Sequence, residues 1–313
     1  MTGRDHSGNS SGPRSHFFNV GGHIFCLDFD TNDCNSMELL PSFAAFVADS
    51  SEVLQPILFT LLVDDQTKPV PERHLLRSFD TGNGDTLVYM LPNGGYQFII
   101  RDISQNDCCL LIANASFSKC RCALHGDFIM RSFGLNNAVM LAYAFASSFH
   151  QTLLIHASCI LASDGRAYPF IAASGTGKST HTSLWLKYIE NCSLLNDDNP
   201  VIRINADGKP IIYGSPWSGK TPCYRRCCAP LGAVTRIERA PVNSIEHLRP
   251  VEAFAALLPA CSSMKWDLDI YKNLCDSITR IIETTPVYTL HCLPDEAAAR
   301  LCHSTLISQK SSN

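Results

Sequence analysis

The stretch YPFIAASGTGKSTHTSLWLKYIE, residues 168–190, constrains the fold of this chain more than any other. An apolar run typical of a buried strand passes through a turn rich in Gly, Ser and Thr into a segment that places Leu184, Trp185 and Tyr188 at helical spacing. Glycines let the backbone adopt positive φ beside an anion, and a helix that begins there directs free N–H groups toward that anion. The stretch therefore predicts a phosphate-binding loop between a strand and a helix.

Two segments of the sequence compete for this role. Residues 172–179, AASGTGKS, depart from the pattern G-x-x-x-x-G-K-[ST] only at Ala172, whereas residues 214–221, GSPWSGKT, match it at every position. In the second segment Pro216 removes a backbone donor and Trp217 crowds the turn, and the residues that follow show no helical face. We therefore expect the first segment to bind a nucleotide, although the second is the better match.

The pattern assigns a role to each residue of the first loop. The backbone of the turn is expected to cradle the phosphates, while Lys178 reaches the β and γ phosphates and Ser179 offers its hydroxyl to Mg²⁺. Thr180 is expected to assist at the α phosphate. The predicted nucleotide-binding residues are Ser174, Gly175, Thr176, Gly177, Lys178, Ser179 and Thr180.

A pair of carboxylates follows the loop at a short distance in the sequence. Asp197 and Asp198 end the apolar run of NCSLLNDDN, 19 and 20 residues after Lys178. A kinase needs a carboxylate for its metal and a base for the acceptor hydroxyl, so we expect one aspartate of the pair, Asp197 or Asp198, to bind Mg²⁺ and the other to take the proton. The alternative is an Asn-Asp-Asp-Asn turn that only caps the strand.

The rest of the sequence indicates two regions. Residues 1–15 have the composition of a disordered tail, and residues 16–134 are predicted to be rich in β-strands, with a hairpin at PNGG, residues 92–95. Residues 135–313 alternate strand and helix, beginning with an apolar helix at 136–148, which predicts an α/β domain.

Composition excludes several classes of function. A net charge of −4 provides no general basic field for nucleic acid. Residues 132–163 lack charge, but SSFHQT interrupts the run, so we expect a buried helix and strand and no membrane partner. The fifteen cysteines are odd in number, scattered and not preceded by a leader, which predicts reduced thiols in the cytoplasm; their spacing fits no common zinc site.

Four segments together resemble a known family. LLIHASCI, FIAASGTGKSTHTSLWL, LLNDDNPVIRI and YGSPWSGKTP are similar to the C-terminal domain of HPr kinase/phosphorylase, within the phosphoenolpyruvate carboxykinase-like P-loop superfamily. The resemblance covers about residues 152–245 and extends more weakly to Leu301. It implies a P-loop kinase fold, and it implies that His156 lies close to the transferred phosphate. The glycine-rich acidic signature of true HPr kinases is absent after the aspartates.

The expected function is transfer of the γ-phosphate of ATP, with Mg²⁺, to a serine-type hydroxyl of a small molecule, peptide or protein. Two cations that follow GSPW, Lys220 and then Arg225, are expected to complete the clamp on the phosphate, unless they belong to a solvated basic loop. The alternatives are a non-catalytic nucleotide-binding module that recognises a partner peptide, and a carboxykinase. The family resemblance leaves a homo-oligomer open.

Overall fold

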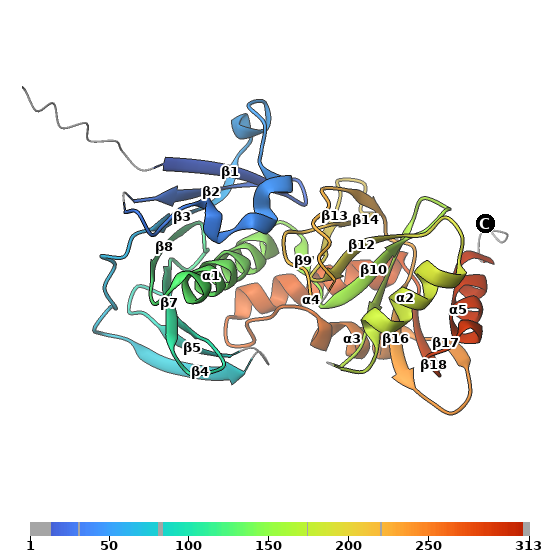
Figure 1. Ribbon diagram of the computed structural model, residues 1–313. Coiled ribbons are helices and arrows are strands. Elements are labelled where there is room, and N and C mark those ends of the chain that lie inside the picture. The colour runs from blue at the N-terminus through green and yellow to red at the C-terminus, as the bar shows by residue number, and fades with distance from the viewer. Residues whose placement is uncertain (1–13, 31, 81–83, 174, 220, 309–313) are drawn as a thin grey trace, which may run out of the picture. The chain divides into compact units, whose positions relative to one another are not determined.

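The computed structural model describes residues 14–30, 32–80, 84–173, 175–219 and 221–308 (Figure 1). The described residues form a mixed α/β structure with three sheets. The chain divides into two compact units. The first comprises Met1–Phe18, Ile24–Pro41 and Asp49–Ala142, and the second comprises Asn19–His23, Ser42–Ala48 and Tyr143–Asn313.

An eight-stranded sheet accounts for most of the first unit, as the β-rich prediction required. Its order is β1 (Arg14–Val20), β2 (His23–Phe29), β3 (Ile57–Val63), β8 (Lys119–Leu124), β7 (Asp107–Ala113), β6 (Tyr96–Arg101), β5 (Asp85–Met90) and β4 (His74–Asp80). The predicted hairpin is confirmed between β5 and β6, where Gly94 N donates to Leu91 O. Of the tail predicted over residues 1–15, Arg14 and Ser15 instead begin β1, and residues 1–13 lie outside the described part.

Short 3₁₀ segments and one long helix complete this half of the sequence. The 3₁₀ segments are η1 (Met37–Leu39), η2 (Pro41–Phe46) and η3 (Glu52–Leu54). The helix α1 (Phe128–Ser148) begins eight residues before the predicted 136–148. Gly134 lets it approach the sheet, because a Cβ there would lie 2.7 Å from Cys108 O.

The second unit contains two sheets. The six-stranded sheet has the order β12 (Ser193–Asp198), β10 (Ala157–Leu161), β11 (Ala167–Ile171), β16 (Val234–Arg239), β18 (Val287–Cys292) and β17 (Ser244–His247). The four-stranded sheet has the order β15 (Cys228–Pro230), β14 (Pro210–Tyr213), β13 (Val201–Ile204) and β9 (Thr152–Leu154). Strands β11, β16 and β18 run parallel, so their carboxyl ends lie at one edge of the larger sheet.

Four α-helices and one 3₁₀ segment belong to the second unit: α2 (Lys178–Tyr188), α3 (Pro250–Leu257), η4 (Leu258–Ala260), α4 (Leu268–Thr284) and α5 (Glu296–Ser308). Ile270, Leu274 and Ile278 form an apolar stripe on α4 and are buried. Asp295 caps α5, since its Oδ1 accepts from Ala298 N at 2.8 Å. The side chain of Trp185, on α2, is fully buried in one of the two apolar clusters of this unit.

Two further predictions concern the chain as a whole. All fifteen cysteines are free thiols, in agreement with the prediction that they form no disulfides. Across the described residues, the helices are too short or too polar to span a bilayer.

Candidate functional site

The first glycine-rich segment has the predicted form of strand, loop and helix. Strand β11 ends at Ile171, and α2 begins at Lys178. Gly175 has φ +74° and Gly177 has φ +130°, values that favour glycine over any residue with a side chain. Among the described residues, no atom lies within 4 Å of a Cβ built on Gly175, so open space adjoins the loop. Ser174 lies outside the described residues.

The beginning of α2 presents free backbone donors beside this loop. The first bond of the helix runs from His181 N to Gly177 O at 2.9 Å. The N–H groups of Lys178, Ser179 and Thr180 precede it, and helix geometry provides them with no acceptor inside the helix. Such donors, together with the helix dipole, stabilise a bound anion.

Asp197 lies directly beside the start of α2. Ser179 Oγ donates to Asp197 Oδ1 at 3.0 Å, and Asp197 is only 3% exposed. Strand β10 lies between β11 and β12 and pairs Ser158 with Asp197. Ser158 Oγ also accepts from Thr182 on α2 at 2.8 Å. The sheet and the helix therefore fix the hydroxyl of Ser179 and the carboxylate of Asp197 in one place.

A second set of contacts links Lys178, His156 and Asp198. Lys178 Nζ lies 2.8 Å from His156 Nε2, and His156 Nδ1 lies 2.9 Å from Asp198 Oδ1. Because an ammonium group can only donate, Nε2 accepts, and Nδ1 carries the proton that faces Asp198. Burial lowers the pKa of Lys178, and the carboxylates of Asp198 and Asp197 offset part of that effect.

The backbone of Asp198 is strained. Its φ of +150° lies in a region that residues other than glycine rarely adopt, which costs about 1–3 kcal/mol. The surroundings hold it in place: Asn199 Nδ2 donates to Asp198 Oδ2 at 2.7 Å, and Asp198 pairs with Ala157 on β10 and with Ser218. Strain of this kind is found most often at functional sites.

The second glycine-rich segment lacks the form of strand, loop and helix, because the described residues directly after Thr221 form no helix. It contacts Asp197 instead. Gly219 N and Ser218 Oγ donate to the backbone oxygen of Asp197, and Thr221 N donates to Asp197 Oδ2 at 3.2 Å. The segment thus holds the backbone oxygen and Oδ2 of Asp197, while Ser179 contacts Oδ1.

Trp217, in the same segment, serves as packing. It is 3% exposed and lies against Tyr143 and Phe43, with ring centroids 5.3 and 5.9 Å away. Asn196 Nδ2 donates to Trp217 O at 3.2 Å and so connects this aromatic cluster to β12.

Of the two predicted cations, Arg225 does not join this group. Arg225 Nη1 donates to Leu194 O at 2.5 Å and to Ser193 Oγ at 3.2 Å, both at the N-terminal end of β12. Leu194 precedes Asp198 by four residues, a span of about 13 Å in a strand. Arg225 was predicted only because it is a cation in a loop, and a charge in the sequence does not indicate where its side chain points. Lys220 lies outside the described residues.

Sequence reasoning missed another arginine that contacts the first glycine-rich loop. Arg239, the last residue of β16, donates from Nη2 to Gly175 O at 2.7 Å and from Nε to Thr176 O at 3.0 Å. The available signal was its position after the apolar run AVTRI, at the carboxyl end of a parallel strand, where α/β sheets bind ligands.

The oxygen donors present fit Mg²⁺ that binds together with phosphates. Among the described residues there is no group of three or more His, Cys, Asp or Glu side chains that could hold a metal alone. Mg²⁺ usually takes one or two protein oxygens and completes its octahedron with water and substrate phosphates. The Ser179 hydroxyl and the Asp197 carboxylate, 3.0 Å apart, provide such a pair.

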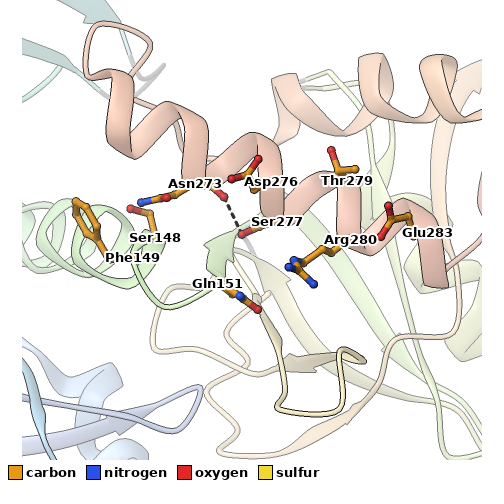
Figure 2. A pocket seen from close by; sticks show the side chains of 9 residues that line it. All are labelled: Ser148, Phe149, Gln151, Asn273, Asp276, Ser277, Thr279, Arg280 and Glu283. Atoms are coloured by element: carbon orange, nitrogen blue, oxygen red, sulfur yellow. Dashed lines mark hydrogen bonds between the residues drawn. The ribbon is translucent and has the colours of Figure 1, made fainter.

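Two of the cavities lined by described residues lie in the second unit. One, of about 60 Å³, adjoins the phosphate loop and is lined in part by Thr176, Gly177, His181 and Arg239. The other, of about 550 Å³, lies between the residues that follow α1 and one face of α4, and Figure 2 shows Arg280 directed into it near Gln151. None of the predicted site residues lines this larger cavity.

A scan against models of protein families finds no match to this chain, and a search of curated proteins finds none either.

Proposed function

We propose that this protein is an ATP- and Mg²⁺-dependent kinase. One observation carries the proposal: the N-terminus of α2, the Lys178 ammonium and the hydrogen-bonded pair of Ser179 Oγ and Asp197 Oδ1 lie together at one glycine-rich loop. Helix donors and a lysine suit phosphate, and a hydroxyl beside a carboxylate suits the metal that accompanies phosphate. No simpler role accounts for all of these groups at one loop.

Each residue then has a distinct task. The N–H groups at the start of α2 and the Lys178 ammonium bind the phosphates, and Ser179 and Asp197 hold Mg²⁺. Bound Mg²⁺ neutralises charge on the phosphate oxygens. Asp198 takes the proton of the acceptor hydroxyl, and its contact with His156 Nδ1 orients the carboxylate.

Lys178 must exchange partners when phosphate binds. Its ammonium contacts His156 Nε2 and Ala172 O, at 2.8 and 3.2 Å. A phosphate is a stronger partner for an ammonium than either group, because both partners are then charged. Binding would therefore release His156 Nε2, leaving an imidazole beside the reacting groups.

The acceptor class rests on the family resemblance. The similarity to HPr kinase/phosphorylase supports a serine-type hydroxyl in a small molecule, peptide or protein. The odd number of scattered cysteines supports the cytoplasm as the compartment. The resemblance also supports the finer fold assignment, a P-loop domain of the HPr-kinase type. The mixed α/β structure with parallel β11, β16 and β18 is compatible with this assignment.

The test is transfer of radioactive γ-phosphate from ATP, with Mg²⁺, to a panel of hydroxyl-bearing metabolites, peptides and proteins. The proposal predicts a labelled product with wild-type protein and none with Asp198→Asn. Nucleotide binding without transfer to any acceptor would favour a regulatory nucleotide-binding module. If neither binding nor transfer occurs at millimolar ATP, the proposal is wrong.

A further inference from the structure

Arg239 forms a two-point contact with the phosphate loop. One guanidinium donates from Nη2 to Gly175 O at 2.7 Å and from Nε to Thr176 O at 3.0 Å. Both acceptors are backbone oxygens of consecutive residues, so the planar fork of the guanidinium engages two adjacent peptide groups at once. The side chain itself is exposed.

The register of the sheet brings this arginine to the loop. Strand β16 runs parallel to β11 and pairs Arg236 with Ile171, the last residue before the loop. Arg239 comes three residues later, at the carboxyl end of β16. The loop and Arg239 therefore leave the same edge of the sheet, side by side.

The contact fixes the direction of the donors in the loop. In a trans peptide the C=O and the following N–H point in opposite directions. When Thr176 O faces Arg239, the N–H of Gly177 faces the other side of the loop. The peptide after Gly175 is fixed in the same way, since Gly175 O faces Arg239 and Thr176 N donates to Ala173 O at 3.2 Å.

The loop needs such a constraint. Gly175 and Gly177 flank the peptides concerned, and both have positive φ. Glycine loses more conformational freedom on ordering than any other residue, so a loop free of outside contacts would sample several peptide orientations. Phosphate binding would then have to order the loop, and the free-energy cost of that ordering would weaken the observed affinity.

We infer that Arg239 is a positioning residue of the phosphate loop, which holds the backbone of residues 175–177 in the orientation that binds phosphate before the ligand arrives. This inference rests on the proposed function. Arg239 contributes through the loop carbonyls and not through direct charge attraction to the nucleotide. A lysine at this position keeps the charge but loses the fork, so it should fail in nearly the same way as alanine.

The experiment measures binding of ADP and of AMP by calorimetry, with Mg²⁺ present, to the full chain. The variants are Arg239→Ala, Arg239→Lys and, as a control, Arg300→Ala, which removes an exposed arginine paired with Glu296 on α5. We expect both Arg239 variants to bind ADP about tenfold more weakly than wild type, about 1.4 kcal/mol. AMP, which lacks the β phosphate, should change less, and the Tm of both variants should stay near that of the control.

Three results would overturn the inference. If wild type binds ADP and Arg239→Ala binds it equally well, Arg239 does not position the loop, while the proposed function stands. If Arg239→Lys binds like wild type and only alanine weakens binding, charge attraction explains the effect. If wild type binds neither nucleotide, the inference fails together with the proposed function.

Discussion

The strained backbone at Asp198 can be tested by a matched pair of substitutions. Asp198→Ala and Asp198→Gly both remove the carboxylate, so both lose the contacts with His156 Nδ1 and Asn199 Nδ2. They differ only in the Cβ on a residue whose φ is +150°. A residue other than glycine costs about 1–3 kcal/mol at such a position. Glycine lowers the stability by about 0.4–1 kcal/mol, because it gives the unfolded chain more conformational freedom. Glycine should therefore be more stable than alanine by about 1 kcal/mol.

A glycine variant that is more stable than the matched alanine variant is unusual. At an ordinary strand position, glycine is the less stable of the two residues by about 0.5–1 kcal/mol. The lost contact between His156 and Asp198 does not affect the comparison, because both variants lose it. It is also a weak pair, since the side chains of His156 and Asp198 are 44% and 32% exposed and such contacts contribute about 0–1 kcal/mol.

Urea unfolding followed by tryptophan fluorescence measures the difference directly. With equal m-values, the midpoint of Asp198→Gly should lie above that of Asp198→Ala, and its Tm should be higher by about 2–4 °C. Under the proposed function neither variant should transfer phosphate. Equal midpoints, or a higher midpoint for alanine, would refute the reasoning that the fold forces Asp198 into a costly conformation.

Three other predictions concern the same unit. Mg²⁺ should raise the ADP affinity of wild type, and Ser179→Ala and Asp197→Asn should each reduce that gain about tenfold. Calorimetry with and without Mg²⁺ measures the gain, and an unchanged gain would show that neither residue is a metal ligand. Arg225→Ala should leave the rate of phosphate transfer within about twofold of wild type, because its guanidinium binds the N-terminal end of β12. A much larger loss would show that Arg225 takes part in the reaction. Burial lowers the pKa of His181 from 6.5 to about 4, so the unfolded chain binds a proton that the fold excludes between these values, and stability falls as pH falls through this window. His181→Phe should remove that contribution, about 2 kcal/mol, from the pH dependence of unfolding between pH 7 and 4.5, and an identical pH profile would contradict it.

Local sequence was sufficient to predict the strand, loop and helix of the first glycine-rich segment. The apolar run before Ala172, the glycines and the helical spacing after Lys178 are all contiguous, so the strand, loop and helix could be predicted without knowledge of the fold. The position of Asp197 beside Ser179 could also be anticipated, because one helix and one turn separate a loop from the next strand of an α/β sheet.

Long-range placement could not be predicted in the same way. Arg239 reaches the loop through the register of β16 with β11, which no pattern within either segment encodes. Arg225 is closer to the aspartates in sequence, yet it is bound at the other end of β12. The start of α1 at Phe128 was missed for a related reason: Gly134 looks unfavourable for a helix until its close contact with Cys108 O is known.

A crystal structure of the protein with Mg²⁺ and a non-hydrolysable ATP analogue tests the central claim most directly. The account predicts the β and γ phosphates at the N-terminus of α2, with Lys178 Nζ moved from His156 Nε2 to a phosphate oxygen and Mg²⁺ bound between Ser179 Oγ and Asp197. An analogue bound elsewhere, or a Lys178 that keeps its contact with His156 while the loop stays free of phosphate, would contradict it.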